Sequence, residues 1–442
     1  MPTNEKMNHY MRGLVFDLYN SAPPSYHIRM QSINRRKFIS STSISLSAML
    51  MNTLSQDSSN PEDAIGDFKP FIKKDNLPNP VIIESLSMFK RDKNWFIRAR
   101  SKDGIEGWSV GHPSKTELSQ SVFTKVIAPF MRNKDARKLD QLVDQIFLSG
   151  SNYKMQGQLF WVQVAAAEFA ILDLLGKTAK LSAANLLGGQ KRNKIDLYIA
   201  NNHRSKNAEE SLRRIIKSVD SINAKALKIK IGGRMKVVDS IPMRTEKLIP
   251  KVAESLGKRC TLYADANSSY TSVKKAIKVG KILEENGFSF YEEPVPFDYL
   301  NETNQVADAL KIPIAWGEQE SSQWRFKWMI ENSGVRIFQP DLFYYGGIIR
   351  SLRVAQMAAA KGFDCTPHIS GGGLGFLYMG IYAASCPNPG PYQEYKGLTN
   401  DFPWESTGEK ISVMNGSMTA PNGHGIGVNI DPDYLEKAQR VG

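Results

Sequence analysis

Three short apolar runs in the second half of the chain each end in an acidic residue: TLYAD at 261–265, SFYEE at 289–293 and IAWGE at 314–318. The pattern continues with VRIFQPD at 335–341 and DCTPH at 364–368, where the last polar residue is a histidine. Successive runs are spaced by about the length of one β/α unit. Short apolar runs bounded by turn residues are typical of buried parallel strands.

Strands and helices are predicted to alternate from residue 194 onward, which indicates a parallel α/β fold. The predicted strands cover 195–199, 226–231, 261–264, 289–291, 314–315, 335–338 and 364–365, and the helices between them include 208–219, 272–285 and 349–361. Polar strand ends can converge on one pocket in a barrel, whereas tips five strands apart in an open sheet cannot meet. We therefore expect an α/β fold of the modified (β/α)₈ TIM-barrel type.

The segment before the barrel has a different pattern. Strand-like runs at 81–89 and 94–100 precede helical patterns at 119–131, 137–148 and 159–175. We therefore predict four parts, an export signal and linker, an α+β capping domain, the barrel, and a C-terminal segment that returns to the capping domain, with bounds 1–77, 78–195, 196–385 and 386–442.

The N-terminal region resembles a twin-arginine export signal, because Arg35 and Arg36 precede a weakly apolar, serine-rich stretch. We expect a periplasmic or exported protein, or a cytoplasmic one if this segment is not functional. The three cysteines fit no metal or disulfide spacing. A net charge of +13 suits an anionic small molecule. Basic blocks interleaved with aromatics and apolar runs of 18 residues are both missing, so neither nucleic acid nor a membrane is an expected partner.

The residues at the strand ends predict a metal site. Asp265, the Glu292–Glu293 pair and Glu318 would repel one another at one barrel mouth unless a cation lay between them. Carboxylate oxygens favour a hard ion, and Mg²⁺ fits better than zinc.

Lysine and histidine at the same mouth predict acid–base chemistry. Lys228 and Lys230 face the same side of their strand, and a lysine near another cation can act as a base. His368 has a partner in Asp341, one strand earlier, which could hold the imidazole and raise its basicity.

In their order and spacing, these motifs resemble the mandelate racemase subgroup of the enolase superfamily, over residues 78–435. They are LDLLGK at 172–177, NLLGG at 185–189, KIK at 228–230, DAN at 265–267, EEP at 292–294, GE at 317–318, PD at 340–341, GG at 346–347, PH at 367–368 and GIGV at 425–428.

The resemblance implies roles for individual residues. Asp265, Glu292 and Glu318 would bind Mg²⁺, while Lys230 and the His368–Asp341 pair would be the two acid/base groups. Lys228, Asn267 and Glu394 would contact the substrate, Glu394 by hydrogen-bonding its carboxylate. The resemblance also implies a homo-oligomer, either a dimer or an octamer.

The expected activity is Mg²⁺-dependent removal of the proton α to a carboxylate. Dehydration of an acid sugar to a 2-keto-3-deoxy sugar acid is the leading interpretation. A racemase, epimerase or cycloisomerase acting on a sugar acid is the second. An exported binding protein on a barrel that has lost its catalysis is the third, and such a protein would lack a metal ligand or a base.

Overall fold

The computed structural model describes residues 68–442, apart from 202–203, 205, 238, 371–372, 398–402 and 406–410. The predicted export signal lies outside the described residues, so the localisation stays a prediction. The described part, Phe68–Gly442, is one compact unit.

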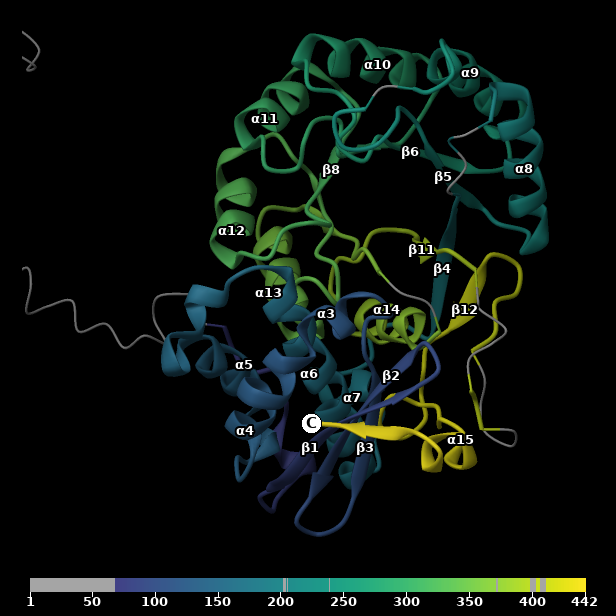
Figure 1. Cartoon of the computed structure of the whole chain (residues 1–442). Coiled ribbons are helices and arrows are strands. Elements are labelled where there is room, and N and C mark those ends of the chain that lie inside the picture. The colour runs from purple at the N-terminus through teal and green to yellow at the C-terminus, as the bar shows by residue number, and fades with distance from the viewer. Residues whose placement is uncertain are drawn as a thin grey trace, which may run out of the picture. The chain divides into compact units, whose positions relative to one another are not determined.

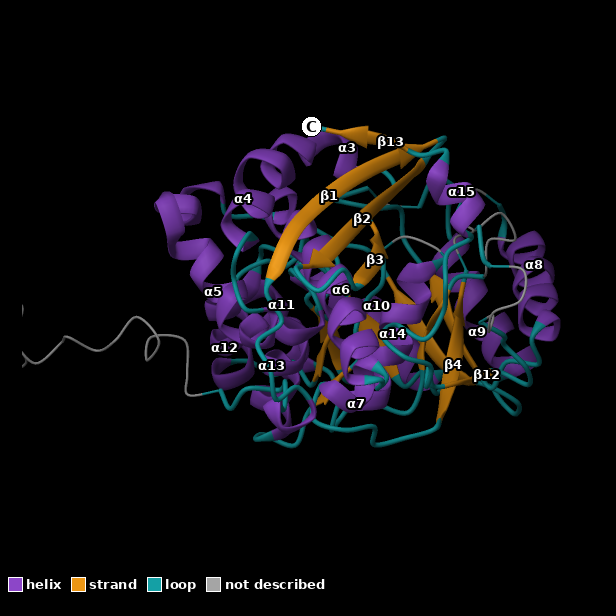
Figure 2. Ribbon diagram, turned by 90° about the horizontal axis from the view of Figure 1, so that it is seen from below, coloured by secondary structure: helices purple, strands orange, loops and turns teal. Residues whose placement is uncertain are grey.

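A four-stranded antiparallel sheet forms the first layer of the capping domain, in the order β13-β1-β2-β3. Its strands are β1 (Ile83–Arg91), β2 (Asn94–Ser101), β3 (Glu106–Val110) and β13 (Gln439–Val441). Along β2, Ile97 and Ala99 are fully buried while Arg98 and Arg100 remain partly exposed. This alternation gives the sheet one face toward a core. Figure 2 shows it as a layer separate from the barrel strands.

Helices make up the rest of the capping domain, and some of them pack against that sheet. They are α3 (Lys115–Val122), η2 (Phe123–Ile127), α4 (Ala128–Met131), η3 (Ala136–Lys138), α5 (Leu139–Leu148), η4 (Ser149–Met155), α6 (Gln158–Ala179) and α7 (Ala183–Leu186), after a short η1 (Lys74–Asn76). The helical pattern predicted at 119–131 is confirmed as the end of α3, the π-helical turn η2 and α4, and Pro129, which lacks an N–H, stands in the first turn of α4.

Helix α6 is the core of the capping domain. It is long and apolar enough to cross a membrane by length and composition, but 94% of its apolar window is buried inside the protein. Gly107 lets β3 approach α6 closely, because a Cβ at this position would lie 2.2 Å from the backbone nitrogen of Leu174.

Eight parallel strands form the second part of the fold, in the order β11-β4-β5-β6-β7-β8-β9-β10. Figure 1 labels β4, β5, β6, β8 and β11 of this sheet. They are β4 (Lys194–Ala200), β5 (Ala226–Lys230), β6 (Thr261–Asp265), β7 (Phe290–Glu292), β8 (Ile314–Trp316), β9 (Ile337–Phe338), β10 (Asp364–Cys365) and β11 (Gln393–Tyr395). The predicted barrel with an α+β capping domain is thereby confirmed.

The barrel interior is packed. Tyr263 and Phe290 stack at 3.9 Å between ring centroids, and Tyr198 meets Tyr263 edge to face at 5.5 Å. Helices cover the outside of the sheet (Figure 1). They are α8 (Ala208–Ser221), α9 (Arg244–Leu256), α10 (Val273–Glu285), α11 (Leu300–Ala309), α12 (Gln323–Asn332), α13 (Ile348–Ala359) and α14 (Leu374–Ser385).

The C-terminal segment serves both parts of the fold. Strand β11 pairs with β4 and is therefore the eighth barrel strand, although it lies beyond the range of 196–385 predicted for the barrel. Strand β12 (Ser417–Thr419) also pairs with β4, whereas β13 follows α15 (Pro432–Glu436) and pairs with β1. The backbone N–H of Cys365 in β10 donates to the carbonyl of Asn388, so β10 contacts the loop that leads into β11.

Asp173 of α6 joins three segments of the chain. Its carboxylate, 1% exposed, accepts hydrogen bonds from the backbone N–H groups of Trp108 at 2.8 Å and Ile426 at 3.0 Å, and from Lys177 Nζ at 2.7 Å. Losing it would leave two buried N–H groups without an acceptor.

We predict that Asp173→Ala lowers the free energy of unfolding by about 2–4 kcal/mol, because unsatisfied buried donors are costly. Denaturant unfolding measures this loss. As a control, Glu117→Ala removes an exposed ion pair with Lys90 and should change stability by no more than about 0.5 kcal/mol. Equal stabilities of Asp173→Ala and the unsubstituted protein would contradict the assignment.

Candidate active site

The register of the parallel strands brings charged side chains to one level at the barrel mouth. Lys230, the last residue of β5, pairs with Asp265, the last residue of β6, and Asp265 pairs with Glu292, the last residue of β7. Glu318 follows β8 by two residues. Parallel strands that pair in register end at the same edge of the sheet. Residues at the ends of neighbouring strands therefore lie next to one another at the barrel mouth.

Asp265, Glu292 and Glu318 form a cluster that could hold a metal ion. One carboxylate oxygen from each lies within 4.8 Å of the others, and all three residues are buried. Glu293 is not part of this cluster, and one of its oxygens instead accepts from Ser268 Oγ at 3.3 Å. Within the described part of the chain, Glu292 Oε1 and Glu318 Oε2 accept no hydrogen bond. Buried carboxylate oxygens with open coordination fit a hard divalent cation.

The two lysines of β5 neutralise part of this negative charge. Lys228, fully buried, lies 2.7 Å from Glu292 Oε2 and 2.9 Å from Glu394 Oε1. Lys230 contacts Asp265 Oδ2. Burial alone would disfavour the ammonium of Lys228, but Glu292 and Glu394 raise its pKa well above its ordinary value. Lys228 is therefore a permanent cation of the site.

The acids have pKa values shifted in opposite directions. Burial, together with repulsion from Asp265, raises the pKa of Glu292 to about 8. Burial acts on Asp265 in the same sense, but Lys230 and Lys228 outweigh it and lower the pKa of Asp265 below its usual range. A cluster in which one acid resists ionisation has a deficit of positive charge, which a metal ion would supply.

His368 and Asp341 form the predicted pair. They meet across a parallel β-bridge, and His368 Nδ1 lies 2.6 Å from Asp341 Oδ2. Asp341 also accepts from the backbone and hydroxyl of Ser370. Nε2 therefore faces the cluster, 3.3 Å from Glu318 Oε2. Burial lowers the pKa of His368, but Glu318, Glu394 and Asp341 together raise it above its ordinary value.

The remaining predicted residues also reach this site. Glu394 of β11 is fully buried, and its Oε2 lies 3.6 Å from His368 Nε2. Asn267 donates its backbone N–H to Asp265 at 2.7 Å and its side-chain amide to Glu318 at 3.3 Å. Asn267 thus supports two members of the acidic cluster, while its contact with a substrate stays a prediction.

Sequence reasoning missed three polar residues of the site. Lys396 Nζ lies 2.9 Å from His368 Nε2 and 3.0 Å from Glu394 Oε2. Gln339 donates to Glu292 Oε2 at 3.1 Å, and Arg204 donates to Asn267 Oδ1 at 2.6 Å. The period of two along β11 places Lys396 on the face of Glu394, and this signal could have identified it.

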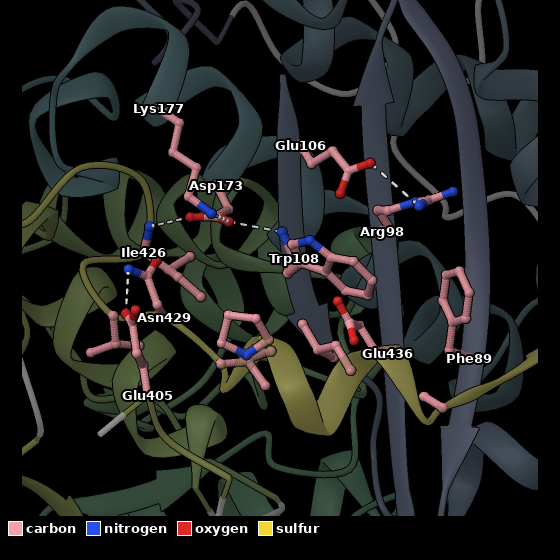
Figure 3. A pocket seen from close by; sticks show the side chains of 15 residues that line it. Phe89, Arg98, Glu106, Trp108, Asp173, Lys177, Glu405, Ile426, Asn429 and Glu436 are labelled. Atoms are coloured by element: carbon pink, nitrogen blue, oxygen red, sulfur yellow. Dashed lines mark hydrogen bonds and ion pairs between the residues drawn. The ribbon is translucent and has the colours of Figure 1, made fainter. Parts of the chain in front are cut away.

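A cavity of about 490 Å³ lies elsewhere, between the outer face of the capping sheet and the C-terminal segment (Figure 3). Four of its charged groups form ion pairs, Arg98 with Glu106 at 3.3 Å and Lys177 with Asp173 at 2.7 Å, and Glu405 accepts a hydrogen bond from Asn429 at 2.9 Å. These pairs hold the capping domain together. The chemistry is therefore assigned to the barrel mouth, where the acids, bases and open carboxylate oxygens converge.

An eight-stranded parallel barrel with acids, lysines and a histidine–aspartate pair at its mouth defines a barrel enzyme with a candidate metal centre. A family model described as enolase C-terminal domain-like matches residues 210–434, just over half of the chain. The arabinonate dehydratase of Saccharolobus solfataricus is 28% identical over 323 residues, covering 73% of this chain and 84% of that enzyme. The D-galactarolactone cycloisomerase of Agrobacterium fabrum is 27% identical over 367 residues, covering 80% of this chain and 93% of that enzyme.

A solved structure agrees with these relatives. The mandelate racemase/muconate lactonizing protein of Paracoccus denitrificans PD1222, crystallised with magnesium, superposes with a TM-score of 0.69 at 27% identity, covering 82% of this chain and 98% of that one. The chain belongs to the enolase superfamily, in the family of mandelate racemase and the muconate-lactonizing enzymes. The predicted family and enzyme class are thus confirmed.

We predict that Mg²⁺ or Mn²⁺ stabilises the protein by about 2.7 kcal/mol when its concentration is a hundred times the dissociation constant. Glu292→Gln should abolish this gain, because it removes one charged ligand of the cluster. Melting temperatures measured with and without EDTA test the prediction.

Glu320→Gln is the matched control, since Glu320 lies two residues beyond Glu318 on the loop after β8 but pairs with Arg325 at 2.6 Å. It should keep the metal-dependent shift. If Glu292→Gln responds to Mg²⁺ as fully as this control does, the cluster is not the metal site.

Proposed function

We propose that the protein is a Mg²⁺-dependent acid-sugar dehydratase that removes the proton α to a carboxylate and expels the neighbouring hydroxyl as water. The observation that carries this proposal is the convergence of Lys230, the acidic cluster and the His368–Asp341 pair on one barrel mouth. Relatives named as arabinonate and galactonate dehydratases support it.

Magnesium would be held by Asp265, Glu292 and Glu318, and when bound it would supply a Lewis acid that stabilises negative charge developing on the substrate carboxylate. Lys228 is a cationic group fixed at this level, fully buried and held by Glu292 and Glu394. Its ammonium would attract the substrate carboxylate and orient it for proton removal.

Lys230 would act as the base, with its Nζ accepting the α-proton. The two electrons of the broken C–H bond form a double bond between C2 and C3 as the hydroxyl leaves C3. His368 would give its Nε2 proton to that hydroxyl, which departs as water, and the resulting enol tautomerises to the 2-keto-3-deoxy acid. Asp341 holds Nδ1 and thereby keeps Nε2 directed at the pocket.

Cycloisomerisation is a second candidate, favoured by the similarity to a D-galactarolactone cycloisomerase that this chain covers over 93% of its length. The same α-proton would be removed, but the leaving group would be a ring oxygen that stays in the molecule. The two reactions differ in mass, because a dehydratase product has lost water whereas a cycloisomerase product has not. All the predicted ligands and bases are present at the site, so a binding protein on a retired barrel is not favoured.

Incubation with acid sugars in heavy water tests the proposed function. We expect a product lighter than its substrate by one water, with deuterium at the former C3, detected by mass spectrometry as a 2-keto acid. The substrate panel comprises arabinonate, galactonate and galactarate, with galactarolactone added for the second candidate. Deuterium exchange or isomerisation without loss of water would contradict the dehydratase assignment.

Lys230→Ala and His368→Asn should each lower kcat by about 10²–10⁴-fold, because each removes a positioned proton-transfer group. Steady-state rates on the best acid of the panel measure the loss. Lys217→Ala on α8 and His424→Asn serve as controls, since both side chains are exposed and neither residue stands at the end of a barrel strand. Full activity in either site variant would overturn its role.

A further inference from the structure

One histidine of the capping domain reaches the barrel mouth. His112 lies between β3 and α3 and is 5% exposed. Its ring packs edge-on against Phe343 at 5.5 Å and tilted against Tyr344 at 5.3 Å between centroids. These aromatic residues lie two and three positions after Asp341, and the charges of Asp341 and His368 both act on the His112 imidazole. His112 therefore belongs to the His368 side of the site.

The surrounding backbone fixes the tautomer of His112. Its Nδ1 accepts hydrogen bonds from the backbone N–H groups of Ser114 at 3.2 Å and Lys115 at 3.1 Å. An atom that accepts two N–H groups carries no proton, so the neutral ring carries its proton on Nε2. Burial lowers the pKa of His112 to about 4, so the ring is neutral near pH 7.

The Nε2–H of His112 is a buried donor without an acceptor among the residues that the structure describes. Leaving such a donor unsatisfied costs free energy, and orphaned buried donors are rare in folded proteins. The loop that carries it is closely packed, since a Cβ at Gly111 would lie 2.5 Å from Thr116 Oγ1, and the backbone N–H of Gly111 donates to the Trp95 carbonyl at 2.9 Å. The imidazole of His112 therefore offers a buried N–H donor, Nε2–H, beside the His368 side of the site.

We propose that His112 donates a hydrogen bond from Nε2 to an oxygen of the bound sugar acid and thereby helps to select the substrate. In the proposed reaction, the residues at the strand ends would hold the carboxylate and the two reacting carbons of the sugar acid. The capping domain would then contact the remaining carbons and hydroxyls of that substrate. A hydroxyl oxygen beyond C3 is the acceptor of suitable chemistry. This inference rests on the proposed function, and it adds a specificity-determining residue to the same site.

His112 could instead have a purely structural role, because its Nδ1 accepts hydrogen bonds from the backbone N–H groups at the start of α3. Two substitutions separate the roles. His112→Asn keeps an acceptor near the position of Nδ1 but removes the Nε2 donor. His112→Gln places an amide donor near the position of Nε2 but loses the Nδ1 acceptor. Donation to the substrate predicts that the Asn variant is the damaged one, whereas a structural cap predicts the reverse.

We expect His112→Asn to melt at the temperature of the unsubstituted protein while its kcat/KM on the best acid of the panel falls about 10–100-fold, the usual effect of losing one hydrogen bond in a buried site. His112→Gln should keep kcat/KM within about 5-fold. On a substrate analogue that lacks the contacted hydroxyl, the Asn variant and the unsubstituted protein should become equal. If the Asn variant keeps full kcat/KM on every acid, the proposal is overturned.

Nuclear magnetic resonance of ¹⁵N-histidine-labelled protein gives a readout that does not depend on turnover, since the chain has only six histidines. We expect the Nε2–H tautomer for His112, and a shift of its Nε2 signal when Mg²⁺ and galactonate are added. An Nδ1–H tautomer, or an Nε2 signal that none of the panel acids moves, would overturn the proposal. Failure of the proposed function is distinguishable, because the unsubstituted protein would then release no 2-keto acid from any member of the panel.

Discussion

Parallel pairing in register along β5, β6 and β7 sets Lys230 beside Asp265 and Asp265 beside Glu292. These contacts are enforced by the backbone ladder, so the side chains cannot separate without breaking the barrel. The strands that carry them are buried on both faces, and only their carboxyl ends present charge. The barrel thus concentrates several ionised groups in a volume where isolated charges would be unstable.

Charge balance then explains the arrangement around those strand ends. Lys228 forms ion pairs with Glu292 and Glu394, and Asp341 holds the imidazole of His368 through its Nδ1 atom. These groups do not satisfy every carboxylate oxygen of the site. One buried oxygen of Glu292 and one of Glu318 accept no hydrogen bond among the described residues. A divalent cation would restore the balance and would supply the electrostatic stabilisation that the proposed removal of an α-proton needs. Fold, electrostatics and chemistry therefore depend on the same few contacts.

Much of this site could be predicted from the sequence, because residues that recur once per β/α unit come together at one mouth of a barrel. Polar residues that follow apolar runs at nearly equal intervals must converge, and Asp265, Glu292, Glu318, Asp341 and His368 do so. Strand β11 was left out of the predicted barrel range because it has only three residues after a proline-rich turn, too few to identify a strand. His112 could not be found in this way, since its place beside Phe343 and Tyr344 follows from how the capping domain packs on the barrel. The oligomeric state stays a prediction, because it depends on surfaces rather than on the periodicity of strands.

The central claim is that one divalent ion lies among the ends of β6, β7 and β8. Crystals grown with Mn²⁺ and measured for anomalous scattering test it most directly. The account predicts a single strong peak in contact with carboxylate oxygens of Asp265, Glu292 and Glu318. A peak elsewhere, or a map without a peak among three carboxylates that point away from one another, would contradict it.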